Sequence, residues 1–80
     1  MTDNSKSDTL TRQTVEKILC YIKENELKSG DFLPTETEMV KIFKVSRVII
    51  REAFSYLKGL GLIVSRRGSG FRLAEVDLIG

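Results

Sequence analysis

The apolar positions of the chain fall into three segments with helical spacing and two short segments with strand character. In the first helical segment they stand at i, i+3, i+4 and i+7, and they are Val15, Ile18, Leu19 and Ile22. This spacing places one apolar stripe along a helix, which we expect from about residue 10 to about residue 25, with Thr9 or Thr11 as its N-cap. The polar, aperiodic residues 1–9 predict a disordered N-terminal arm.

A capping box opens the second helical segment. Thr35 is followed three residues later by Glu38, and an apolar run begins directly afterwards. In this arrangement each of the two side chains satisfies a backbone N–H group of the other residue. We expect a helix that ends at about Phe43 or Lys44. Its inward stripe should consist of Met39, Ile42 and Phe43, with Val40 beside them.

The third helical segment begins at Ser46, whose hydroxyl can cap the helix that follows. Gly61 suits the position just past a helix end, so we expect the helix to stop near Leu60. The residues at spacings of four and three that should form its buried stripe are Ile50, Phe54 and Leu57.

Only Lys44 and Val45 separate the second segment from the third, and two helices joined by so short a link form a helix-turn-helix. Ahead of it, residues 28–31 predict a turn, and Phe32-Leu33 predicts a short extended piece. After it, two β-rich runs at residues 62–65 and 71–74 flank a glycine-containing hairpin tip at 66–70.

This order of elements predicts a mainly α fold with a small β-hairpin, namely a winged helix-turn-helix of three helices plus a two-stranded wing. The domain should cover residues 10–74, with the helix-turn-helix at about 36–55 and the wing at about 62–74. Residues 75–80 have no partner element and are interpreted as a linker.

Positive charge is concentrated in one part of the chain. The formal net charge is only +2, but residues 44–73 contain seven basic residues and a single acid, Glu52. Arg47 and Arg51 lie four apart in the first two turns of the third helix, where the helix dipole disfavours cations. Two arginines there indicate an anionic partner, and a contiguous basic segment is typical of a nucleic-acid-binding surface. The alternative is a pair of solvated arginines on a surface helix.

Several function classes find no support in the residues. Without a histidine, a cluster of metal ligands or an activated nucleophile, the chain is expected to be no enzyme and to need no cofactor. The single cysteine, Cys20, lies in an apolar helical pattern and is expected to be buried or half-buried. No helix follows Gly68-Ser69-Gly70, which favours a hairpin tip over a nucleotide-binding loop. With no membrane-spanning run and no signal peptide, we expect a cytoplasmic protein with no membrane partner.

An ordered string of motifs resembles the N-terminal domain of GntR-family bacterial transcription regulators, and most of all their FadR-type branch. The resemblance covers roughly residues 10–74. It rests on Gly30-Asp31-Phe32-Leu33-Pro34-Thr35-Glu36, Val45-Ser46-Arg47, Arg51-Glu52-Ala53-Phe54, Leu57 with Gly61-Leu62-Ile63, and Gly68-Ser69-Gly70.

The resemblance implies sequence-specific binding to a double-stranded, palindromic operator as a homodimer. The third helix would enter the major groove and the wing would reach the minor groove. A small-molecule effector would act only through a further domain, missing from this chain, to which residues 75–80 would lead. The whole regulator would then be a ligand-responsive repressor.

The family's DNA-contacting positions fall on residues of the second helix, the third helix and the wing: Thr37, Ser46, Arg47, Val48, Ile49, Arg51, Arg67, Gly68 and Ser69. Val48 and Ile49 lie off the buried stripe, so they can touch thymine methyl groups; the alternative for them is partial burial against the first helix. Glu52 should orient a neighbouring arginine or cap the fold rather than read cytosine.

This chain departs from the family pattern at several of these positions. Val48 and Ile49 stand where the family usually has threonine, proline or another small residue, and Thr37 stands where arginine is common. Lys44 replaces the usual glycine of the turn, which predicts left-handed backbone strain there. Phe71 replaces a small residue just past the wing tip. These changes imply an operator unlike the commoner ones of the family. A winged helix used for contact with protein or RNA is the alternative function, and the arginine-rich third helix argues against it.

Overall fold

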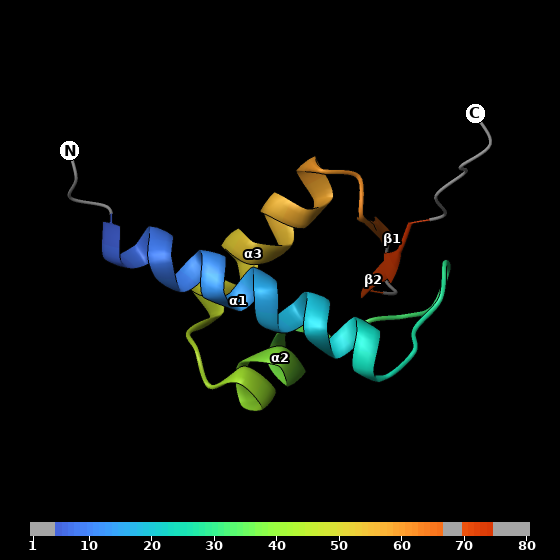
Figure 1. Ribbon diagram of the computed structural model, residues 1–80, viewed down its shortest axis with the longest axis horizontal. Helices are drawn as coiled ribbons and strands as arrows, with labels where there is room; N and C mark the ends of the chain where they lie inside the picture. The colour runs from blue at the N-terminus through green and yellow to red at the C-terminus, as the bar shows by residue number, and fades with distance from the viewer. Residues whose placement is uncertain (1–4, 67–69, 75–80) are drawn as a thin grey trace.

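The computed structural model describes residues 5–66 and 70–74, and it arranges them as three helices and a two-stranded antiparallel hairpin (Figure 1). The elements in chain order are α1 (Ser5–Glu24), α2 (Glu36–Phe43), α3 (Arg47–Gly59), β1 (Ile63–Arg66) and β2 (Gly70–Leu73). In Figure 1, α1 crosses in front of α3, α2 lies below them, and the hairpin lies to the right. The winged helix-turn-helix predicted from the sequence is confirmed. Within the described ranges, no helix is both long and apolar enough to cross a membrane.

Helix α1 begins five residues earlier than the apolar pattern indicates. It starts at Ser5, so the expectation of a disordered arm is wrong for residues 5–9, and neither Thr9 nor Thr11 caps the helix; residues 1–4 lie outside the described part of the chain. Apolar periodicity locates only those turns that meet the core. It does not register a polar turn that extends the helix beyond the core, and serine and aspartate are well tolerated near a helix start.

The end of α1 is set by a residue in the left-handed conformation. Glu26 has φ 52°, and its N–H group donates to the Lys23 carbonyl at 3.1 Å. The Leu27 N–H group donates to the Ile22 carbonyl at 3.0 Å, which completes a Schellman motif. Leu27, the residue after Glu26, packs against the hydrophobic core. Helix α3 ends in the same manner, with Gly61 at φ 79° as predicted.

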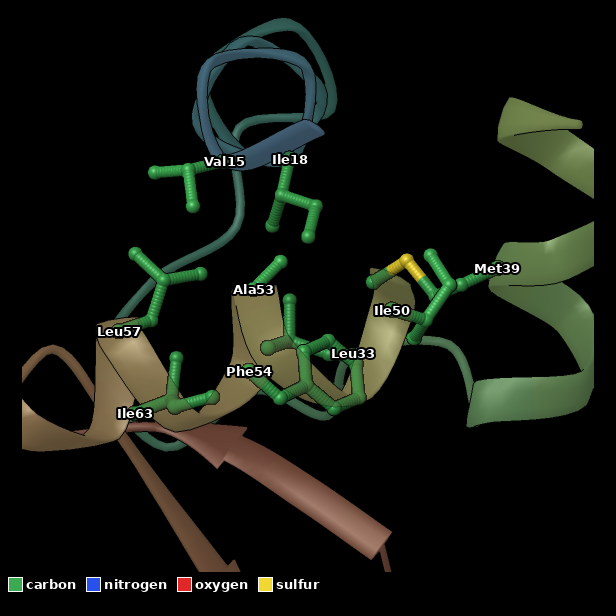
Figure 2. Packing of buried hydrophobic residues seen from close by; sticks show 9 residues of the cluster. All are labelled: Val15, Ile18, Leu33, Met39, Ile50, Ala53, Phe54, Leu57 and Ile63. Atoms are coloured by element: carbon green, nitrogen blue, oxygen red, sulfur yellow. The ribbon is translucent and has the colours of Figure 1, made fainter. Parts of the chain in front are cut away.

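The hydrophobic core lies between α1 and α3 and is closed by side chains from the other elements. Figure 2 shows Val15 and Ile18 pointing from α1 toward α3. The predicted stripe of α3 is confirmed, since Ile50, Phe54 and Leu57 are all buried. The remaining members of the core cluster are Leu33, Met39, Ala53 and Ile63.

Three residues predicted to be buried are exposed instead. Leu19 retains 41% and Ile42 44% of their accessible surface, and Cys20 is exposed as well. On α1 the buried face is turned toward Thr14, which is 1% exposed and whose hydroxyl donates to the Leu10 carbonyl at 2.7 Å. A threonine hydroxyl bonded to its own helix can be buried, so the core face of α1 includes Thr14 on one side, and Leu19 on the other side of the stripe is exposed.

The extended piece before α2 acts as a third strand beside the hairpin. Phe32 forms an antiparallel bridge with Arg72, and the Leu33 N–H group donates to the Phe71 carbonyl at 2.9 Å. On the other side of Phe32, the Leu73 N–H group donates to the Asp31 carbonyl at 3.0 Å. The rings of Phe54 and Phe71 lie 4.3 Å apart between centroids. The wing is therefore joined both to the chain that leads into α2 and to the core face of α3.

Candidate nucleic-acid interface

The turn between α2 and α3 fixes how the third helix is presented. Lys44 adopts the left-handed conformation at φ 55° and ψ 46°, and its N–H group donates to the Val40 carbonyl at 2.9 Å. This confirms the strain predicted for a residue that replaces glycine, which for a non-glycine residue is about 1–2 kcal/mol. Because the left-handed residue turns the chain sharply, α3 begins close to the end of α2.

Ser46 opens α3 as predicted. Its backbone is extended at φ −72° and ψ 160°, and its hydroxyl accepts a hydrogen bond from the Ile49 N–H group at 3.3 Å. The N–H groups of a first helical turn have no partner within the helix. Ser46 caps one of these groups in α3, so the others can still donate to an anion. The capping box of α2 is present in the same way, with Thr35 and Glu38 bonding to each other's backbone.

Helix α3 has two chemically distinct faces. One carries the buried stripe of the core, and the other carries Arg47, Val48 and Arg51 at its N-terminal end. Val48 is 62% exposed, and the side chains of Arg47 and Arg51 are 49% and 66% exposed. Two cations and one apolar side chain therefore stand together on the solvent side of the first two turns.

Glu36 of α2 binds both of these arginines. Its Oε1 atom accepts from Arg47 Nη1 at 3.3 Å, and its Oε2 atom accepts from Arg51 Nε at 3.2 Å. Arg47 Nη2 donates in addition to the hydroxyl of Thr37 at 3.2 Å. Glu36 lies in the first turn of α2, where an acid is favoured by the helix dipole, so α2 places a carboxylate against the cations of α3.

The structure brings most of the predicted helix residues together and separates one from them. Arg47, Arg51 and Thr37 meet around Glu36, while Ser46 caps the helix beside them. Ile49 is only 8% exposed, which agrees with the alternative of burial and argues against contact of its side chain with a DNA base. Ile49 directly precedes Ile50 of the buried stripe, and the buried face of α3 is wide enough to include both side chains. The predicted wing residues Arg67, Gly68 and Ser69 lie outside the described ranges.

Two charged residues of the basic segment serve the fold. Glu52 does not orient an arginine among the described residues. Instead, its Oε1 atom accepts from the hydroxyl of Thr11 at 2.7 Å and links α3 to α1. Arg72 Nε donates to the Gly30 carbonyl at 3.3 Å, and its guanidinium lies over the ring of Phe32. A count of the basic residues in the segment 44–73 therefore overestimates the positive charge that the folded domain presents to a ligand.

The role of Glu36 is the part of this surface that the sequence analysis did not find. The residue directly follows the N-cap Thr35, where an acid is explained by helix capping alone. Its two partners are 11 and 15 residues away in the sequence. Only the angle between α2 and α3 brings them together. Within the described ranges no group of histidine, cysteine, aspartate and glutamate side chains could hold a metal ion.

The winged helix presents arginines from the first turns of α3, and its fold is also found in known proteins. The model of the bacterial regulatory proteins of the gntR family matches residues 10–73. The chain belongs to the gntR family. The match is thus to a domain of bacterial regulatory proteins rather than to an enzyme family. The assignment to the FadR-type branch stays a prediction.

Individual relatives agree with this membership. The uncharacterized HTH-type transcriptional regulator YcbG of Bacillus subtilis (strain 168) is 40% identical over 68 residues, which are 85% of this chain and 29% of the relative. The mannosyl-D-glycerate transport/metabolism system repressor MngR of Escherichia coli (strain K12) is 41% identical over 66 residues, or 82% of this chain and 28% of the relative. This gntR-family chain thus spans less than a third of either relative's length.

A solved structure has the same fold. The AraR DNA-binding domain in complex with the operator ORR3 is similar with a TM-score of 0.74 at 34% identity, and the match covers 81% of this chain and 78% of that one. The winged helix-turn-helix of this gntR-family domain is therefore one that, in AraR, is found on operator DNA.

Proposed function

We propose that this domain binds double-stranded operator DNA in a sequence-specific manner, as the operator-reading domain of a bacterial transcription regulator. The observation that carries the proposal is the exposed face at the start of α3, where Arg47, Val48 and Arg51 stand together. The major groove of B-DNA admits an α-helix and presents guanine O6 and N7 to arginine and the thymine methyl group to apolar side chains. Membership of the gntR family and the operator complex of the similar AraR domain support it.

Each group on this face has a proposed role. Arg47 and Arg51 bind guanine edges, and Val48 contacts a thymine methyl group. Ser46 and the N–H groups of the first turn of α3 bind a phosphate, as does the hydroxyl of Thr37. Ile49 is left out of this set because it is buried. For the wing, the family resemblance supports contact of Arg67, Gly68 and Ser69 with the minor groove.

The domain is further proposed to pair on DNA. Two copies would occupy the half-sites of a palindromic operator as a homodimer, as two-fold symmetric regulators of this architecture do. In the whole regulator a small-molecule effector would bind a different domain and would release or fix the dimer on its operator in the cytoplasm. We propose that the whole regulator is a repressor, and a relative named as a repressor supports this.

The proposal is tested by selecting bound duplexes from a random DNA pool, which gives the half-site and the spacing of half-sites together. Binding to the selected duplex should then weaken steeply as salt is raised, with a log–log slope of about −0.9 per phosphate neutralised. A pool that yields no common sequence, or affinity that does not respond to salt, would contradict operator binding. Either of these results would favour a winged helix that contacts protein. A preference for RNA duplexes over DNA duplexes would favour the RNA alternative.

Oligomeric state gives a separate test. We expect sedimentation to find a monomer or a weak dimer without DNA and two copies on one selected duplex. A tight dimer in the absence of DNA would contradict pairing that is driven by the operator.

A further inference from the structure

One carboxylate shared by two exposed arginines needs an explanation other than stability. The side chains of Arg47 and Arg51 are 49% and 66% exposed, and that of Glu36 is 26% exposed. Ion pairs exposed to this degree contribute little to folding, because water screens the attraction and the side chains lose rotamer freedom. The fold is already held by the core and the caps of α2 and α3. The arrangement is thus better explained by what it does to the two arginines.

Glu36 holds the two guanidinium groups through different nitrogen atoms. Arg51 is held through Nε, and its Nη1 and Nη2 atoms make no hydrogen bond to any described residue. These two atoms form the end-on fork that matches guanine O6 and N7. Arg47 donates through Nη1 to Glu36 and through Nη2 to Thr37, so both nitrogens of its end-on fork already have a partner. Arg51 is therefore pre-set to offer its fork, whereas Arg47 must share or exchange a partner when it binds a base.

The carboxylate also changes the charge that an approaching duplex meets. A phosphate that approaches either guanidinium comes close to the negative charge of Glu36 as well, and like charges repel most strongly where little water lies between them. The O6 and N7 edge of guanine carries no net charge, so it suffers less from the same carboxylate. Glu36 thus weakens contacts to any backbone more than it weakens contacts to the correct base.

We propose that Glu36 is a specificity-determining positioning residue: its carboxylate orients Arg51 for a base edge, holds Arg47 beside it, and lowers the affinity of the domain for non-operator DNA. This inference rests on the proposed function, because it assumes that α3 reads the major groove. It adds an acidic residue of α2 to a surface otherwise explained by its cations.

The test compares Glu36→Gln with Glu24→Gln in the 80-residue chain. Glu24 is exposed at the last residue of α1, so the control removes the same charge far from the arginines. Dissociation constants are measured for the selected operator and for a scrambled duplex of the same length at several salt concentrations. We expect Glu36→Gln to bind the scrambled duplex several-fold more tightly than the control does, and to lose roughly tenfold in the ratio of operator to scrambled affinity, within the range of one bidentate arginine contact.

Glu36→Asp separates the two parts of the proposal. It keeps the negative charge but shortens the side chain, so scrambled DNA should stay weakly bound while discrimination falls at the base pairs that Arg47→Ala and Arg51→Ala also affect. In an Arg47→Ala, Arg51→Ala background, Glu36→Gln should cause little further loss of discrimination. Urea midpoints of the Glu36 variants close to that of Glu24→Gln confirm that the fold is intact.

Two results would overturn the inference. One is a specificity ratio for Glu36→Gln equal to that of Glu24→Gln. The other is a loss confined to a single C·G pair that neither arginine variant affects, because Glu36 would then read cytosine directly. Failure of the proposed function looks different, since the unaltered chain would itself fail to select any duplex.

Discussion

The guanidinium of Arg72 lies over the ring of Phe32, with its central carbon 5.1 Å from the ring centroid, and its Nε atom donates to the Gly30 carbonyl. The contact joins the wing strand β2 to the extended piece ahead of α2. A basic residue that the charge pattern assigns to a nucleic-acid surface is thus used to fasten the wing to the rest of the domain.

Replacing Arg72 should therefore affect stability and not recognition. We expect Arg72→Ala to lower the free energy of unfolding by about 1 kcal/mol, because an exposed cation–π contact and a hydrogen bond are lost together. The measurement is urea unfolding, with Arg12→Ala on the exposed surface of α1 as a control for charge. Base discrimination that changes in Arg72→Ala but not in the control would show that Arg72 contacts DNA after all.

Arg47, Arg51 and Arg67 should have separable effects on operator binding. Arg47→Ala and Arg51→Ala are each expected to remove roughly 1–3 kcal/mol of discrimination at particular base pairs, since a bidentate contact to guanine is lost. Arg67→Ala should weaken all sites nearly alike, and A·T-rich centres somewhat more, because the minor groove carries little sequence information. The measurement is affinity for the selected operator and for each of its single-base variants.

Lys58→Ala, in the last turn of α3, is the matched loss of one positive charge on the same helix. It should leave discrimination unchanged. If Arg67→Ala alone abolished discrimination while both helix variants retained it, the docking of α3 in the major groove would be wrong.

Val48 and Ile49 are neighbours with opposite environments, which predicts opposite effects. Val48→Ala should change the free energy of unfolding by less than about 0.5 kcal/mol, as for most surface substitutions, and should reduce preference at one A·T pair. Ile49→Val should cost roughly 0.5–1.5 kcal/mol through loss of a buried methylene group and leave base preference unchanged. Urea unfolding and the panel of single-base variants test both. A change of base preference in Ile49→Val alone would mean that Ile49 reaches DNA despite its burial.

The left-handed conformation of Lys44 predicts a stabilising glycine. We expect Lys44→Gly to raise the free energy of unfolding by up to about 1 kcal/mol, because relief of strain exceeds the added freedom of the unfolded chain. Lys41→Gly is the matched control, since the same substitution within α2 should lower the free energy of unfolding by about 1 kcal/mol. Thermal unfolding of the two variants side by side makes the comparison. Equal destabilisation of both would contradict the strain assigned to Lys44.

The sequence by itself determined the features that depend on neighbours along the chain. The capping box at Thr35 and the N-cap at Ser46 are set by side chains within three residues of the backbone groups they serve. The stripe of α3 was readable because one helix face meets the core over its whole length. These local signals, in order, sufficed to predict a winged helix-turn-helix, and the family motifs follow the same order.

Only the tertiary structure decided which side chains stand together and how far burial extends around each helix. Helical periodicity gives the direction of a buried face but not its width, which depends on the partner helices, so Ile49 is covered while Leu19 and Ile42 are exposed. The pairing of residues 30–33 with β2 and the bond between Thr11 and Glu52 join segments distant in sequence. The angle between α2 and α3 places the carboxylate of Glu36 within 3.3 Å of both arginines. That distance is a property of packing, since no spacing along the chain specifies it.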